Sequence, residues 1–218
     1  MSEGRSQGDA VRATRAHKRL FPLVARRLTQ SFTKARLVPL GGHVLLGDLS
    51  RIEQAFAEAA IDSALWRRAL DIVTHETRSF GATLLPITGS AIPNAPVTQS
   101  IGEVSEHYFS DGWYLRDQRM AGTSVFMKTG VIDDSDCTNL ENISKHPYYQ
   151  EFLAPHGLRW FAGIKVACGD EVWCLSIQRK IEQGLFPPEE KIRLAALSRS
   201  LSTSCGASTG CSRLDRVC

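Results

Sequence analysis

The stretch that decides the fold reads Phe161-Ala-Gly-Ile-Lys-Val-Ala-Cys168-Gly169-Asp170-Glu171-Val-Trp-Cys-Leu-Ser-Ile-Gln178. Two runs rich in apolar residues, 161–168 and 171–178, flank Gly169-Asp170. Glycine adopts positive φ without a Cβ clash, so a two-residue Gly-X loop favours a tight β-hairpin. Counting back from the turn predicts four cross-strand pairs: Cys168 with Glu171, Val166 with Trp173, Ile164 with Leu175, and Ala162 with Ile177.

These paired residues share one face of the hairpin, because side chains along a strand alternate between faces. We expect this face, with Trp173, to be the core side. Lys165, Cys174 and Ser176 fall on the opposite face, so Cys168 and Cys174 should not bond to each other. The start of the sequence lacks the apolar core of a signal peptide, which favours reduced thiols and a cytoplasmic location. The cysteines are Cys137, Cys168, Cys174, Cys205, Cys211 and Cys218.

A helix is predicted after the hairpin. Phe186-Pro187-Pro188-Glu189-Glu190 places proline and two acids at a helix start, where the free N–H groups and the helix dipole favour them. An apolar stripe follows at Leu194, Leu197 and Leu201. We expect the stripe to cover the sheet, and a homodimer interface through this helix is the alternative. The pattern ends after Thr203, so 204–218 is predicted to be an irregular, cysteine-containing tail.

Upstream of the hairpin, the sequence predicts two helices and several shorter elements. Ser50-Arg51-Ile52-Glu53 is a capping-box pattern that opens the first helix, and the second begins at Ser63. The shorter elements are an edge strand over 82–87, a loop over 88–98, a helical turn over 103–109, a strand over 123–128 and a short helix over 148–154. The sum is an α/β (α+β) fold: a GAF/PAS-like sandwich with a mixed, mainly antiparallel sheet flanked by helices.

The net charge is distributed unevenly. Residues 1–40 hold nine Lys or Arg and two acids, whereas the whole chain of 218 residues carries a net charge of +3, so the remainder is mildly acidic. We therefore divide the chain into a basic arm (1–42), disordered or partly helical, a folded domain (48–203) and the tail. The composition of the arm favours a solvated extension. The alternatives are a segment that contacts nucleic acid or an anionic membrane, and a transit peptide. No apolar run of about 18 residues predicts a membrane span.

Three segments occur in an order that resembles a known family. They are Leu65-Trp66-Arg67-Arg68-Ala69-Leu70, then Tyr149-Gln150-Glu151-Phe152-Leu153-Ala154-Pro155-His156-Gly157-Leu158, and, beyond the hairpin, Phe186-Pro187-Pro188-Glu189-Glu190 with Leu194-Ala195-Ala196-Leu197. Over residues 48–203 the chain is similar to the GAF-like sensor region of bacterial LuxR-type transcription regulators. This resemblance implies a cytoplasmic, often dimeric, small-molecule sensor coupled to a C-terminal helix-turn-helix that binds promoter DNA.

The sequence departs from that family at its end. A helix-turn-helix needs about 60 further residues with several amphipathic helices, and about fifteen irregular ones follow Thr203. We expect DNA binding only in a full-length regulator. Truncation, frameshift and a stand-alone sensor all remain open.

Motifs of catalysis are not found in the sequence. It holds no nucleophile elbow, phosphate loop, HExxH helix or paired-carboxylate signature, so no enzyme and no cofactor are predicted. Asp133, Asp134 and Asp136 lack the glycine and final glutamate of a calcium loop, so no metal site is expected there. For His146 and His156, a capping or core hydrogen bond is the expected role. A small enzyme of unknown class and a non-functional remnant of a regulator are the alternatives to a sensor.

Ligand binding is the function we expect. Small-molecule pockets are mostly apolar and aromatic, with a few polar groups that orient the ligand. The densest such mixture gives the candidate ligand-binding residues Tyr108, Trp113, Tyr114, Asp117, Phe126 and Trp160. In LuxR-type sensors of acyl-homoserine lactones, Trp, Tyr and Asp of this region contact the lactone. The spacing here differs, so the ligand stays unidentified.

Overall fold

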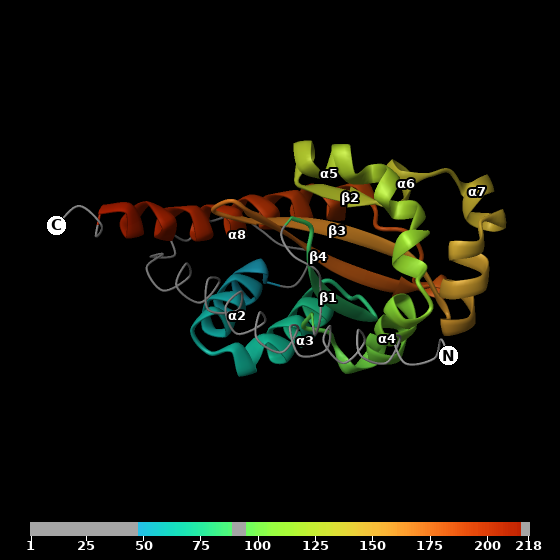
Figure 1. Cartoon of the computed structure of the whole chain (residues 1–218), viewed down its shortest axis with the longest axis horizontal. Helices are drawn as coiled ribbons and strands as arrows, with labels where there is room; N and C mark the ends of the chain where they lie inside the picture. The colour runs from blue at the N-terminus through green and yellow to red at the C-terminus, as the bar shows by residue number, and fades with distance from the viewer. Residues whose placement is uncertain (1–47, 89–94, 215–218) are drawn as a thin grey trace, which may run out of the picture.

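The computed structural model describes residues 48–88 and 95–214, the side chains of 204–214 excepted, and shows a sheet between two groups of helices (Figure 1). The strands are β1 (Gly81–Pro86), β2 (Val131–Asp133), β3 (Leu158–Cys168) and β4 (Glu171–Lys180). Their order is β1-β4-β3-β2, and every neighbouring pair is antiparallel. The predicted α+β class, a mainly antiparallel sheet flanked by helices, is confirmed, and the described strands show no parallel pair that would make the sheet mixed.

Helices occupy most of the remaining described chain. The α-helices are α2 (Leu49–Ile61), α3 (Trp66–Glu76), α4 (Gly102–Ser110), α5 (Thr123–Thr129), α6 (Asp134–Cys137), α7 (Leu140–Lys145) and α8 (Pro188–Leu214). Single turns form η1 (Ser63–Leu65), η2 (Gln99–Ile101), η3 (Trp113–Leu115), η4 (Gln118–Gly122), η6 (Ala154–His156) and η7 (Ile181–Gln183), and the π-helix η5 covers Tyr148–Leu153. None of the helices in the described part of the chain combines the length and apolarity that a membrane crossing requires.

The β3–β4 hairpin has the predicted register. Cys168 pairs with Glu171, and Ile164 pairs with Leu175. Gly169 in the turn has φ 62°, the left-handed region that made glycine the expected residue. Cys168 belongs to the core between the sheet and the helices α2, α3 and α8, whereas Cys174 lies on the other face. The two thiols therefore point apart, as predicted.

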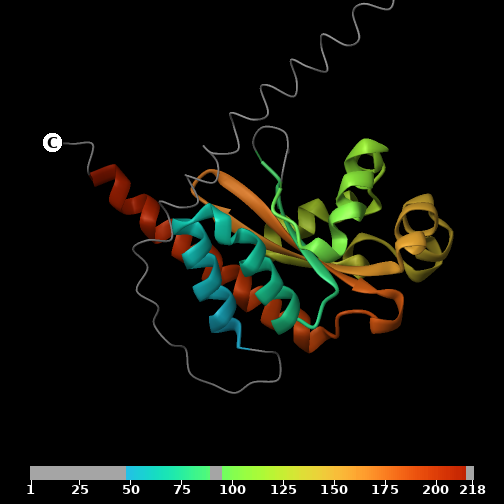
Figure 2. The same cartoon turned by 90° about the horizontal axis from the view of Figure 1, so that it is seen from below.

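Three helices cover one face of the sheet, and Figure 2 shows α2, α3 and α8 together on that side. Trp173 is buried there with the central residues of β3 and β4. The leucine stripe of α8 (Leu194, Leu197 and Leu201) is at most 1% exposed and packs in the same core. Because the stripe packs against the sheet, the expected intramolecular packing of this helix is confirmed.

The ends of two helices differ from the prediction. Helix α2 is capped by Asp48, whose carboxylate accepts the Ser50 backbone N–H, so the cap lies two residues before the predicted Ser50 capping box. The carboxylate of Asp48 is an ionised acceptor for one of the free N–H groups at the helix start. Helix α8 continues past Thr203 to Leu214, so the predicted irregular tail is helical over its described part. The basic arm of 1–42 lies outside the described residues.

The segment 123–128, predicted as a strand, is helix α5. Its β-branched and aromatic residues gave the strand pattern, but Phe126 alone of the seven is buried. Gly130, with φ 80°, then ends the helix and turns the chain into the three-residue strand β2. Together α4, α5, α6, α7 and η5 lie on the side of the sheet opposite α2 and α3 (Figure 2).

Candidate functional site

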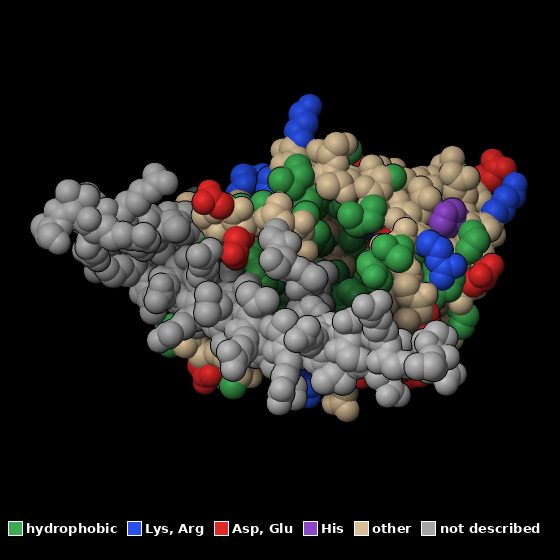
Figure 3. Space-filling model, in the orientation of Figure 1, with side chains coloured by type: hydrophobic (Ala, Val, Ile, Leu, Met, Phe, Trp, Pro, Cys, Tyr) green, Lys and Arg blue, Asp and Glu red, His purple; other side chains and the backbone are tan. Residues whose placement is uncertain are grey.

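A cavity of about 280 Å³ lies over the face of the sheet that α2, α3 and α8 leave uncovered. The floor comes from side chains that alternate away from the helical core, among them Thr83 and Leu85 of β1 and Cys174, Ser176 and Gln178 of β4. Figure 3 shows hydrophobic side chains gathered around a hollow on this face of the molecule. The strand face that held Cys174 and Ser176 in the sequence analysis is therefore the floor of a pocket.

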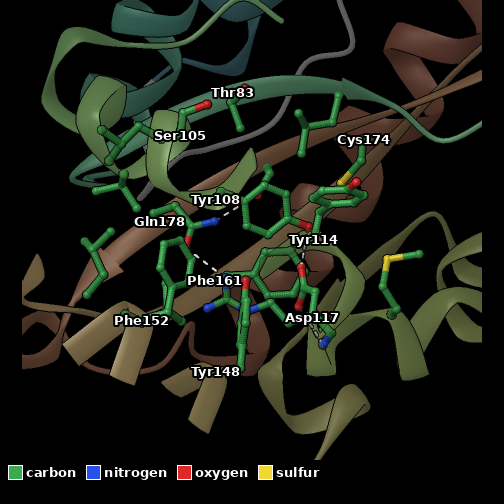
Figure 4. A pocket seen from close by; sticks show the side chains of 18 of the residues that line it. Thr83, Ser105, Tyr108, Tyr114, Asp117, Tyr148, Phe152, Phe161, Cys174 and Gln178 are labelled. Carbon is green, nitrogen blue, oxygen red and sulfur yellow. Dashed lines mark hydrogen bonds between the residues drawn. The ribbon is translucent and has the colours of Figure 1, made fainter. Parts of the chain in front are cut away.

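Helical segments form the walls of this pocket. Helix α4 contributes Tyr108, the chain after it contributes Tyr114, α5 contributes Phe126, and η5 contributes Tyr148 and Phe152. The rings of Tyr108, Tyr114, Tyr148 and Phe152 surround the same space in Figure 4. The lining is therefore largely apolar and aromatic, which is the surface that small organic ligands bury.

Asp117 places a carboxylate at the pocket wall. One of its oxygens accepts the backbone N–H of Arg119 at 2.8 Å and so caps η4. The other accepts the Tyr108 hydroxyl at 2.9 Å. Burial and the neighbouring carboxylate both raise the pKa of Tyr108, so the phenol stays protonated and remains the donor. Asp117 thus fixes the Tyr108 ring and still offers acceptor positions to a ligand.

Arg119 forms the charged part of the pocket floor, and it pairs with Asp134. Its Nε donates to Asp134 at 2.9 Å, and the two side chains are 5% and 0% exposed. Burial raises the pKa of the Asp134 carboxyl, while the Arg119 charge and hydrogen bonds from the Tyr149 hydroxyl and the Phe161 N–H oppose that rise. The cation and the carboxylate therefore compensate each other inside the protein.

The other donors of the guanidinium hold the surrounding elements. Arg119 donates to the Gln178 side chain at 3.1 Å, to the Arg159 carbonyl at 2.9 Å and to the Tyr148 hydroxyl at 3.4 Å. The guanidinium also lies 4.3 Å from the Phe161 ring centroid. Strands β3 and β4 and the π-helix η5 are thereby joined at one residue.

Four of the six predicted site residues line the pocket: Tyr108, Tyr114, Asp117 and Phe126. Trp113 and Trp160 do not. Trp113 stacks on Phe152 with ring centroids 5.3 Å apart, and Arg116 covers its face. Trp160 donates its Nε1–H to the Ile181 carbonyl at 3.2 Å. Both indoles belong to the core cluster behind the pocket wall, where their large apolar surface is buried.

The sequence analysis missed several lining residues. Arg119 and Tyr148 gave no signal, because a lone arginine and an aromatic residue of a short helix are ordinary surface and core residues. Phe152 stood in the family-like segment but was not predicted to line a pocket. Ser176 did give a signal, since the hairpin register already placed it on the face opposite Trp173, and Gln178 lies two positions further along the same face. That face was not considered as a pocket floor.

The three aspartates of 133–136 bind protein groups. Asp134 pairs with Arg119, and Lys191 of α8 bonds to both Asp133 and Asp136. Within the described stretches, no group of three or more His, Cys, Asp or Glu side chains is placed to hold a metal ion. The carboxylates of Asp133 and Asp136 hold the start of α6 against α8, and all three carboxylates are already paired with protein cations.

Cys174 places a thiol on the pocket floor. Burial raises its pKa to about 12, and the negative charge of Asp117 adds to that rise. A thiol with this pKa is almost entirely protonated at neutral pH and is a poor nucleophile. Its surroundings make it an apolar part of the lining.

Comparisons with known proteins concern the fold. No family model matches the sequence, and no curated protein matches it. One similar solved structure is the ligand-binding domain of VqsR from Pseudomonas aeruginosa: identity is 16%, the match covers 71% of this chain and 96% of that one, and the TM-score is 0.49. Another is the N-acylhomoserine lactone-dependent LuxR-family transcription factor CepR2 from Burkholderia cenocepacia, with 16% identity, coverage of 73% and 93%, and a TM-score of 0.46.

Proposed function

We propose that this chain is the small-molecule-sensing domain of a LuxR-type transcription regulator. The observation that carries the proposal is the pocket: about 280 Å³, set over one face of the sheet and lined mainly by apolar and aromatic side chains. The family-like segments of the sequence fall on its parts, since Tyr149–Leu158 includes Phe152, Leu153 and Leu158 of the lining.

The polar groups of the lining favour binding over catalysis. Arg119 is neutralised by Asp134, Tyr108 is bonded to Asp117, and burial keeps the Cys174 thiol protonated. An enzyme needs a nucleophile or an acid–base pair set to react. In the described part of the pocket, Arg119 and Tyr108 are instead each bonded to a carboxylate, and the thiol stays protonated. The ligand we propose is a small, largely apolar molecule with a hydrogen-bond donor for Asp117.

The regulator would act on DNA through a separate domain. After β4, the described chain holds the single turn η7 and the helix α8, and no helix-turn-helix. Sensing is therefore the part of regulation that we assign to the described residues. The homodimer stays a prediction, and the buried leucine stripe of α8 would not form its interface.

A thermal-shift screen of the full chain against small apolar metabolites tests the proposal. The library includes acyl-homoserine lactones, the ligand class of the family that the sequence resembles. A ligand present at 100 times its Kd stabilises the folded state by about 2.7 kcal/mol. For a domain of this size we expect Tm to rise by about 5–10 °C.

Two variants of the same helix supply the control. Ser105 of α4 lines the pocket, so Ser105→Phe should fill the cavity and abolish the shift. Ser110, on the same helix, is exposed and lies outside the lining, so Ser110→Phe should keep the shift. A hit that both variants retain binds elsewhere, and a library without hits argues against a sensor.

A further inference from the structure

Two histidines that the proposed sensing function does not use meet beside the pocket wall. His107 lies in the last turn of α4, and His156 ends η6, so 49 positions separate them in the sequence. The Nδ1 atom of His107 is 3.4 Å from the Nε2 atom of His156. Both side chains are partly exposed, so a small ion can reach the pair from solution.

The surroundings hold the two rings at this spacing. Gly157, with φ 70°, ends η6 directly after His156. The Phe152 ring stands edge-on to the His156 ring at 5.9 Å. The two imidazole centroids are 5.3 Å apart and their planes are inclined by 44°, so the rings are tilted toward each other and not stacked.

The spacing fits a shared metal ion better than a direct hydrogen bond. An N–H donor normally lies about 2.7–3.2 Å from its acceptor, so 3.4 Å is long. Two nitrogens bound tetrahedrally to one zinc ion at about 2.0–2.1 Å lie about 3.3–3.4 Å apart. The observed distance falls at this value.

We infer that His107 and His156 form a binding site for a divalent transition-metal ion, with Zn²⁺ the best fit. Imidazole nitrogen is a preferred ligand of Zn²⁺, Cu²⁺ and Ni²⁺. Across the described residues no third His, Cys, Asp or Glu joins the pair, so water completes the coordination. With only two protein ligands, the ion exchanges with solution and binds less tightly than in a structural zinc site.

A bound ion would join two walls of the ligand pocket. Helix α4 carries Tyr108, and η5, which precedes His156, carries Tyr148 and Phe152. Helix α4 packs on the neighbouring core through side chains that are only partly buried, such as Val104 and Tyr108. An ion that bridges α4 to η6 therefore stabilises the folded pocket wall, whatever the organic ligand is.

Thermal unfolding of the full chain with Zn²⁺ at neutral pH tests the inference. We expect Tm to rise by about 2–4 °C at about 1 mM Zn²⁺ and to return when a chelator is added. His107→Asn and His156→Asn should each lose the rise. The matched control is His75→Asn, because His75 lies on α3 with a side chain 76% exposed and should keep the full rise.

Titration calorimetry on the folded protein is the second measurement, because thiolates of the unfolded chain also bind Zn²⁺ and reduce the shift in Tm. Binding of Zn²⁺ that is lost in both His107→Asn and His156→Asn supports the site. A wild-type protein with no Zn²⁺ binding, or binding that both variants retain, overturns it. If His156→Asn fails to fold, His156→Gln takes its place in the same comparison.

Discussion

At the scale of single residues, the pair formed by Arg119 and Asp134 decides the local structure of the pocket floor. Taking two charges out of water is unfavourable, and only close pairing with further hydrogen bonds offsets that cost. Asp134 accepts from Arg119, from the Tyr149 hydroxyl and from the Phe161 N–H at 2.6–2.9 Å. The carboxylate therefore holds the cation, the π-helix and β3 together.

Removal of this carboxylate should destabilise the fold strongly. Asp134→Ala leaves the Arg119 cation buried without its partner, and such a change costs about 3–5 kcal/mol. Urea unfolding of the purified variant measures the loss. The control is Glu141→Ala, which breaks the exposed pair with Lys145 on α7 and should cost less than about 0.5 kcal/mol. Equal losses in the two variants would contradict the role of Asp134.

Cys174 should react slowly in the folded protein. Its pKa of about 12 leaves about 0.01% thiolate at pH 8, against about a quarter for a thiol with an ordinary pKa near 8.5. We expect alkylation by iodoacetamide at pH 8 to be about 1,000-fold slower than in the urea-unfolded chain. Peptide mapping by mass spectrometry distinguishes Cys174 from the other cysteines. Alkylation of the native protein at the unfolded rate would show that the thiol is not protonated as described.

The pocket could be predicted from the sequence only where aromatic and acidic residues lie close together along the chain. Tyr108, Tyr114 and Asp117 stand close together in the chain, and the structure brings them to one wall. Arg119 could not be predicted, because its burial depends on Asp134, a residue 15 positions away that folds into a different element. Trp113 satisfied the same composition rule as its neighbours and still packs behind the wall.

At the scale of elements, patterns with a fixed local geometry were predicted correctly. The hairpin was placed in register because Gly169-Asp170 fixes its turn. The start of α8 at Pro188 followed from proline and acids at the first turn. Segment 123–128 was predicted wrongly, because a seven-residue helix has fewer than two turns and α5 buries only Phe126, so no apolar stripe repeats along it. Strand β2, with three residues, was too short to show an alternation.

At the scale of the whole molecule, the sheet separates two unlike halves. On one face, α2, α3 and α8 pack a continuous core in which Leu70, Leu175 and Leu197 have no exposed surface. On the other face, short helices surround the cavity, and α4 has no fully buried residue. The first half is one continuous apolar core, and the second half contains the pocket whose walls a ligand would contact.

This division predicts two levels of backbone protection in hydrogen exchange. Amides of β3 and β4, such as those of Ile164 and Leu175, sit in the centre of the sheet and should exchange only when the whole domain unfolds. Amides of α4 should exchange faster by local opening, since the apolar side chains of this helix, such as Val104 and Tyr108, are only partly buried. Exchange measured by mass spectrometry on the unliganded chain tests both statements. A helix α4 as protected as β3 would show a rigid pocket wall, and ligand entry would then need another route.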